Sequence, residues 1–265
     1  MNDSRYERQI RLPEIGPSGQ RKLREARVLV VGVGGLGCPV ALLLAGAGVG
    51  KLGLVDPDRV ELSNLHRQTL YRTSHVGRAK VECAAEEIRA RNPEVALELF
   101  PRVLEPGEIE ALARRFDFVV DGTDSVTAKF ALHDAVLAAG TPLSYAGVVG
   151  WLGQTTTLLP GRGPCLRCLF PVPPADDLPE CQYAGVVGSV VGAVAAVQAN
   201  EVLKALLGVG RLLHGRLLVF DGLALRWREV PLVSDPRCPR CRAGLEVESR
   251  NTTLPREKEP SEWVT

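Results

Sequence analysis

Short apolar runs rich in β-branched residues alternate with helical patterns along the first half of the chain. The runs predict strands, and the apolar or amphipathic stretches between them predict helices. We expect strands at 26–31, 51–55, 95–100 and 116–120, and helices at 40–47, 76–92, 109–115 and 126–139. Strands that alternate with helices are typical of a parallel sheet with helices on both faces. The pattern therefore predicts an α/β fold with a doubly wound, Rossmann-like sheet.

The pattern changes after residue 140. Residues 160–182 are rich in proline, glycine and acid, and they cannot sustain regular structure for long. Asp221-Gly222 is a dipeptide typical of hairpin turns, so C-terminal antiparallel strands should extend the sheet. In this half we expect strands at 142–149, 151–159, 216–220 and 224–230, and one long apolar helix at 188–207.

Composition and charge exclude several classes of partner. The 32 basic and 31 acidic residues give a formal net charge of +1, whereas a surface for nucleic acid or anionic lipid needs a basic excess. The first residues lack the apolar segment of a secretory signal, and the apolar stretches 40–49 and 186–197 are too short to span a membrane. We therefore expect a cytoplasmic protein without nucleic-acid or membrane partners. Its seven cysteines should be thiols or metal ligands rather than disulfides.

A glycine-rich loop follows the first predicted strand and precedes the first predicted helix. The glycines of Gly32-x-Gly34-Gly35-x-Gly37 let the backbone approach a phosphate, and the helix N-terminus supplies unpaired N–H groups. Asp56 ends the second strand nineteen residues after Gly37, where an acid can bind ribose hydroxyls. The loop predicts a nucleotide site, and NAD, FAD and ATP all fit this geometry.

Polar side chains that follow the strands narrow the choice of nucleotide. Asn64, Arg67 and Gln68 come after the second strand, Lys80 lies further along, and Asp124 follows the fourth strand. Strand ends of a doubly wound sheet meet in one crevice, so these groups can lie together. Triphosphate chemistry needs cations on the phosphates and a carboxylate on magnesium, whereas hydride transfer needs neither. The set favours ATP with Mg²⁺.

Four cysteines form two closely spaced pairs. Cys165-x-x-Cys168 and Cys238-x-x-Cys241 lie in segments flanked by proline and glycine, and two such pairs are typical of a tetrahedral zinc site with four cysteine ligands. With all four ligands in use, the zinc should be structural rather than catalytic. Cys38 and Cys83 lie in helical patterns and are interpreted as packing residues.

The ordered set of motifs resembles the MoeB/ThiF/HesA family, the bacterial relatives of ubiquitin-activating enzymes. The match runs in order over about residues 5–245, and both cysteine pairs belong to it. The residues that carry it are Arg8 in Tyr6-Glu-Arg-Gln9, Gly32-x-Gly34-Gly35-Leu36-Gly37, Asp56, Ser63-Asn64-Leu65-x-Arg67-Gln68, Lys80 and Asp121-Gly-x-Asp124.

The resemblance implies an enzyme that uses ATP and Mg²⁺ to adenylate the C-terminal glycine of a ubiquitin-like sulfur-carrier protein. Asp56 would hold the ribose, Arg67 and Lys80 the phosphates, and Asp124 the magnesium ion. Arg8 would reach the ATP of the partner subunit in a homodimer. The resemblance also implies that the glycine loop, Asn64 and Gln68 line the nucleotide site.

The resemblance further implies a single ThiF-type adenylation domain over 5–248. Its nucleotide-binding half would span about 26–140 and its carrier and zinc half about 141–248, with a mobile tail at 249–265. Cys181 matches the position where some members carry a thiol that joins the carrier during sulfur transfer, whereas other members adenylate without one. The acidic residues around it would raise the thiol pKa, so both readings of Cys181 stay open.

Three other functions compete with this hypothesis. The glycine loop alone would suit an NAD(P)-dependent oxidoreductase, but Arg67, Lys80 and Asp124 would then have no task. A binding module without catalysis would not need every charged motif position, and a tRNA-modifying ATP-dependent dehydratase is an alternative within the family. Too few residues follow position 245 for a rhodanese-like domain, so we expect a separate sulfur-donor protein. Which carrier is served, in molybdopterin, thiamin or another thiolation pathway, is not encoded in these motifs.

Overall fold

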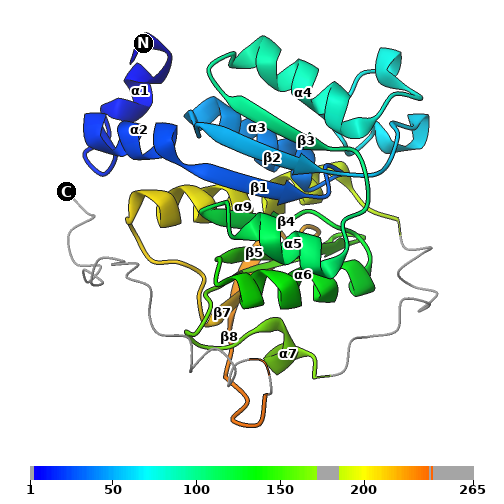
Figure 1. Ribbon diagram of the computed structural model, residues 1–265. Coiled ribbons are helices and arrows are strands. Elements are labelled where there is room, and N and C mark those ends of the chain that lie inside the picture. The colour runs from blue at the N-terminus through cyan, green and yellow to red at the C-terminus, as the bar shows by residue number, and fades with distance from the viewer. Residues whose placement is uncertain (1–2, 172–184, 239, 241–265) are drawn as a thin grey trace.

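One eight-stranded sheet organises the protein, whose computed structural model describes residues 3–171, 185–238 and 240 (Figure 1). The strands lie in the order β3-β2-β1-β4-β5-β6-β7-β8; the first five are parallel and the last three antiparallel. The strands are β1 (Arg27–Val31), β2 (Lys51–Val55), β3 (Ala96–Phe100), β4 (Phe118–Asp121), β5 (Leu143–Val149), β6 (Leu152–Leu158), β7 (Arg216–Asp221) and β8 (Arg226–Pro231). This confirms the doubly wound α/β sheet with antiparallel strands added after residue 140.

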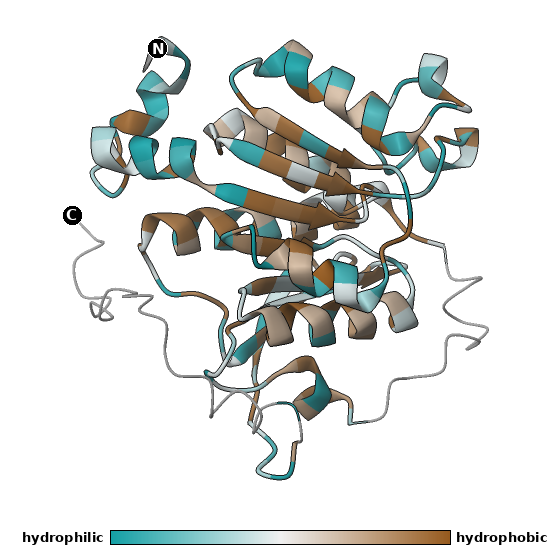
Figure 2. Ribbon diagram, viewed as in Figure 1, coloured by the Kyte–Doolittle hydropathy of each residue, from teal (hydrophilic) through white to brown (hydrophobic). Residues whose placement is uncertain are grey.

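Helices cover both faces of the parallel part of the sheet, as Figures 1 and 2 show. The described α-helices are α1 (Glu7–Ile10), α2 (Gly16–Glu25), α3 (Gly37–Ala47), α4 (Lys80–Arg91), α5 (Pro106–Ala113), α6 (Val126–Ala139), α7 (Leu166–Leu169) and α9 (Gly188–Leu207), and the described 3-10 turns are η1 (Asp3–Tyr6), η2 (Leu62–Asn64) and η3 (Thr73–His75). Val28 and Val30 of β1 face a core shared with α3, α4 and α9, whereas Leu29 and Val31 face a core shared with α5 and α6. Both faces of β1 are buried, which explains its continuous apolar run.

The order in which the chain adds strands to the sheet reverses between β1 and β4. From β1 the chain moves outward through β2 to β3, and β4 then pairs with the other side of β1. In a doubly wound sheet this switch point opens a crevice at the carboxyl ends of the strands. The predicted glycine loop and Asp121-Gly-x-Asp124 both leave the sheet at this point.

Most predicted elements form, with shifted boundaries at three helices. The predicted helix 40–47 begins earlier, at Gly37. The predicted helix 76–92 begins only at Lys80, because Ala79 is extended and forms a bridge with Arg59. The predicted helix 109–115 begins earlier, at Pro106, where Glu105 and Glu108 form a capping box. The short helix α7 lies inside the segment for which little regular structure is expected.

The long apolar helix α9 is a core element. By length and composition α9 could cross a membrane. It packs against β5, β6 and α3, and Val194, Ala195 and Val202 are buried there. A buried core helix passes the same test of length and composition, so α9 carries no argument for a membrane.

Candidate functional site

Two loops meet at the switch point of the sheet, and glycines allow their contact. Gly32 has a φ of +86°, and a Cβ placed on it would lie 2.6 Å from the carbonyl carbon of Gly122. A Cβ on Gly122 would in turn collide with the carbonyl oxygen of Gly32. The loop after β1 and the loop after β4 therefore touch backbone to backbone, and only glycine fits on either side.

Asp56, which directly follows β2, is hydrogen-bonded to the glycine loop. Its carboxylate accepts hydrogen bonds from the backbone N–H of Val33 (2.7 Å) and of Asp58 (2.9 Å). Burial raises the pKa of Asp56, and the nearby Lys80 charge opposes that rise. The structure thus places the acid against the phosphate loop.

Lys80 is a buried cation at the same strand end. Its Nζ atom donates a hydrogen bond to Asp58 across 2.7 Å and lies 3.8 Å from an oxygen of Asp56. Lys80 begins α4, and its side chain is only 7% exposed, whereas the carboxylate of Asp58 is 63% exposed. The cation is therefore held near the loop by one buried and one solvent-facing acid.

The turn after η2 brings the predicted amide and guanidinium groups to the loop. The carbonyl of Asn64 accepts the backbone N–H groups of Arg67 (3.1 Å) and Gln68 (3.0 Å), which closes the turn. A Cβ placed on Gly35 would lie 3.6 Å from the Cγ atom of Arg67. A Cβ placed on Gly34 would lie 3.6 Å from the amide nitrogen of Gln68. The buried Oε1 of Gln68 has no hydrogen-bond partner within the described part of the chain.

Asp124 lies in the loop after β4. Lys129, which the sequence analysis did not identify, holds that loop in place. Asp124 is exposed beside the glycine contact, whereas Asp121 is buried. Lys129 of α6 donates to the carboxylate of Asp121 (3.1 Å) and to the carbonyls of Thr123 and Ala146 (2.7 Å each). A lone lysine on an apolar helix carries no motif signal, so only the fold reveals its role in ordering this loop.

Arg8 lies at the opposite edge of the sheet. Its neighbour Gln9 donates to the carbonyl of Ala47, and Tyr6 accepts a hydrogen bond from Asn92. Ala47 ends α3 and Asn92 follows α4, and both precede the amino ends of strands. The short helix α1, which contains the exposed Arg8, is therefore separated by the length of the strands from the loops at their carboxyl ends (Figure 1).

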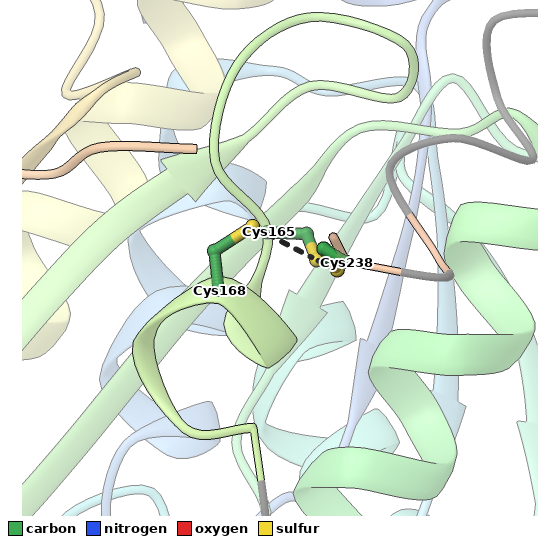
Figure 3. Close-up of side chains that lie close together, drawn as sticks. All are labelled: Cys165, Cys168 and Cys238. Carbon is green, nitrogen blue, oxygen red and sulfur yellow. Dashed lines mark hydrogen bonds between the residues drawn. The ribbon is translucent and has the colours of Figure 1, made fainter. Parts of the chain in front are cut away.

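Three of the four predicted metal ligands come together (Figure 3). The Sγ atom of Cys165 lies 3.9 Å from that of Cys168 and 3.6 Å from that of Cys238. Four sulfurs at about 2.3 Å from a tetrahedral zinc ion would stand about 3.8 Å apart. The backbone N–H of Asp235 also donates to the sulfur of Cys168 (3.4 Å). The fourth predicted ligand, Cys241, and the candidate thiol Cys181 lie outside the described residues.

The remaining described cysteines are packing residues, as predicted. Cys38 and Cys83 are fully buried in the core that α3 and α4 share with the sheet. Burial raises the pKa of Cys38 to about 12, and burial also raises the pKa of Cys83. Both thiols are therefore protonated at neutral pH.

The sequence matches the ThiF family over residues 6–242. The chain belongs to the ThiF family. It is 43% identical over 243 residues to a sulfur carrier protein adenylyltransferase of Thermus thermophilus, and the alignment covers 89% of this chain and 90% of that protein. It is 46% identical over 239 residues to the adenylyltransferase and sulfurtransferase MOCS3 of Bos taurus, covering 89% of this chain and 52% of that protein. This ThiF-family chain thus spans about half the length of its MOCS3 relatives.

Solved structures share this ThiF-family fold. The Escherichia coli protein MccB with ATP superposes with a TM-score of 0.78 at 25% identity and covers 91% of this chain and 75% of that one. The structure of PaaA gives a TM-score of 0.72 at 28% identity, with 88% of this chain and 74% of that one covered.

Proposed function

We propose that this protein is an ATP-dependent adenylyltransferase that activates the C-terminal glycine carboxylate of a ubiquitin-like sulfur carrier. The observation that carries the proposal is the arrangement of Lys80, Asp56 and Arg67 around a glycine loop at the switch point of the sheet. Family membership and the names of two relatives, the Thermus thermophilus protein and the longer MOCS3 protein, support the same activity. They favour it over an NAD(P)-dependent oxidoreductase, because neither name describes redox chemistry.

The reaction requires charge neutralisation more than a protein nucleophile. An oxygen of the carrier carboxylate forms a bond to the α-phosphorus of ATP, the bond from that phosphorus to the bridging oxygen breaks, and pyrophosphate leaves. Both reactants are anionic, so their approach is repelled in the absence of cations. Arg67 and Lys80 would offset this charge, and their fixed positions would lower the barrier by orientation and electrostatics.

Nucleotide and magnesium would bind at the two touching loops. Backbone N–H groups at the start of α3 would bind a phosphate, and the carboxylate of Asp56 would accept a hydrogen bond from a ribose hydroxyl. Asn64 and Gln68 would line the same crevice. Asp124 would hold Mg²⁺, which supplies further positive charge to the phosphates when it is bound.

The cysteine cluster would hold a structural zinc ion. Cys165, Cys168 and Cys238 have sulfur separations suited to tetrahedral coordination, and Cys241 would complete the set. A closed site of four thiolates leaves no position for substrate, so the metal would stabilise the fold. We expect one zinc ion per chain, measured by elemental analysis of native protein.

The partners of the enzyme follow from the same proposal. Because Arg8 lies at the amino edge of its own sheet, it can contribute to catalysis only at the site of a second subunit, which favours a homodimer with shared sites. The MOCS3 relative of Bos taurus is named for a sulfurtransferase activity as well, whereas the Thermus thermophilus relative is named for adenylyl transfer alone. We propose a separate sulfur donor for this chain and a cytoplasmic location.

Exchange of labelled pyrophosphate into ATP tests the proposed reaction. A ubiquitin-like carrier that ends in Gly-Gly should start the exchange, and the same carrier without its last glycine should not. A Cys181→Ala variant should retain the exchange, because adenylation needs no protein thiol. Exchange that is independent of the carrier would contradict the proposed substrate.

A further inference from the structure

Each cysteine pair contains an arginine, and both arginines reach the same carboxylate. Arg167 lies between Cys165 and Cys168, and Arg240 follows Cys238 by two residues. The Nη2 atom of Arg167 lies 2.9 Å from Oδ2 of Asp134, and Nη2 of Arg240 lies 3.2 Å from the same oxygen. One acid on α6 therefore bridges two motifs that are about seventy residues apart in the sequence.

The other oxygen of Asp134 is fixed by the preceding residue. His133 is 1% exposed, and its Nε2 atom accepts the backbone N–H of Leu166 at 3.2 Å. Because Nε2 is the acceptor, Nδ1 carries the proton and donates to Oδ1 of Asp134 at 3.0 Å. The chain Asp134–His133–Leu166 thus ties α6 to the backbone between the first two cysteines.

The environment keeps this carboxylate ionised. Burial alone would raise the pKa of Asp134, but hydrogen bonds from His133 and Arg167 outweigh it and hold the pKa at about 2. The side chain of Asp134 is only 16% exposed. Arg167 also lies over the ring of Phe130 at 4.8 Å, one turn earlier on α6, so its guanidinium is held on two sides.

We propose that Asp134 is a positioning residue of the metal site, a clamp that holds Arg167 and Arg240 and so aligns the two cysteine pairs. This inference rests on the proposed zinc ion. Zinc with four thiolates carries two net negative charges, and two guanidiniums fixed beside the ligands offset that charge. Partners outside the ligand set commonly orient the ligands and tune metal affinity.

The two arginines should not contribute equally. Arg167 is 25% exposed, makes two hydrogen bonds to Asp134 and stacks on Phe130. Arg240 is 49% exposed and makes one ion pair. A more exposed pair is worth less because water screens it. Loss of Arg167 should therefore weaken the metal site more than loss of Arg240.

The rate at which zinc leaves the full-length protein for a chromogenic chelator tests the clamp. Asp134→Asn should release zinc ~10–100-fold faster than the wild type, in line with losses at other outer partners of metal sites. Arg167→Met should follow it, Arg240→Met should show a smaller increase, and Arg167→Lys should recover part of the loss. Glu110→Gln is the matched control, because Glu110 of α5 pairs with Arg114, which follows that helix, and not with an arginine of the cysteine pairs; it should leave the rate unchanged.

A double variant separates the clamp from general destabilisation. If Asp134 acts through Arg167, then Asp134→Asn combined with Arg167→Met should release zinc little faster than Asp134→Asn alone. If Asp134→Asn does not fold, zinc release from Arg167→Met and Arg240→Met still tests the clamp. If the wild type contains zinc and Asp134→Asn, Arg167→Met and Arg240→Met all release it at the wild-type rate, the clamp is wrong but the zinc site is not. A wild type without zinc would overturn the metal assignment and the clamp with it.

Discussion

Lys80 and Asp56 lie 3.8 Å apart at the carboxyl edge of the sheet, and the same carboxylate of Asp56 holds the glycine loop through Val33. The cation proposed for the phosphates and the acid proposed for the ribose therefore form an ion pair, and Asp58 links them by hydrogen bonds to both. Both are already oriented by contacts within the chain. A site oriented in this way loses little freedom when its substrates bind.

Removal of the Lys80 charge should abolish most of the activity. Lys80→Ala should lower carrier adenylation ~10²–10³-fold, the usual cost of losing one electrostatic stabiliser of a transition state. Arg67→Ala and Asp124→Ala should behave alike. Lys51→Ala serves as the control, because Lys51 pairs with Glu98 at the amino end of β2 and should keep its activity. Near-normal turnover in two of the three site variants would contradict the assigned roles.

The backbone contact between the two loops should be sensitive to a single methyl group. Gly122→Ala places a Cβ against the carbonyl of Gly32 and forces the loops apart, which should reduce turnover ~10²-fold through misplacement of the phosphate loop. Gly46→Ala adds the same methyl group to α3, where the described residues place no atom within 4 Å apart from the adjoining residues and backbone of that helix, so it should be neutral. Steady-state kinetics with both variants would measure this, and equal rates would contradict the importance of the contact.

Lys129 should control magnesium use although it is not expected to touch the nucleotide. Lys129→Met removes the bonds that hold Asp121 and Thr123, so the loop with Asp124 should loosen and the Mg²⁺ needed for half-maximal exchange should rise about tenfold or more. Lys129→Arg keeps the charge and should restore part of the response. An unchanged magnesium dependence in Lys129→Met, with the protein folded, would exclude this positioning role.

The helices and strands that could be predicted from the sequence are those whose hydrophobic pattern fits only one kind of element. The strand 51–55 and the helices 126–139 and 188–207 form with the predicted bounds, because each is a largely apolar stretch that ends at a glycine or an acid. Helix α2 (Gly16–Glu25) was not predicted, because Gly16 and Gly19 weaken its helical pattern. Its packing against α9 and α1 is visible only in the fold.

The same distinction applies to the candidate site. Glycines and charges that follow strands could be predicted, because strand ends converge. Lys129, His133 and Asp134 could not, since each acts through contacts made across the fold rather than through a motif. Sequence spacing does not show which helix lies over which loop.

Arg8 should act across a dimer interface. Arg8→Ala should be inactive as a homodimer, and mixing it with Arg67→Ala should restore part of the activity, since one site of a mixed dimer contains both arginines. Subunit exchange must first be verified with differently tagged chains. No recovery after verified exchange would contradict a site shared between subunits.

The intact mass of the carrier tests the central claim most directly. A ubiquitin-like carrier that ends in Gly-Gly should gain the mass of one AMP unit after incubation with this protein, ATP and Mg²⁺, and it should gain nothing with the Lys80→Ala variant. The account predicts that excess pyrophosphate, added while the enzyme is present, returns the carrier to its starting mass, because it reverses the adenylation. A thiol should instead replace the AMP unit with the mass of a thioester, as expected of an acyl-adenylate. A carrier of unchanged mass, under conditions where the wild-type enzyme is folded and binds ATP, would contradict it.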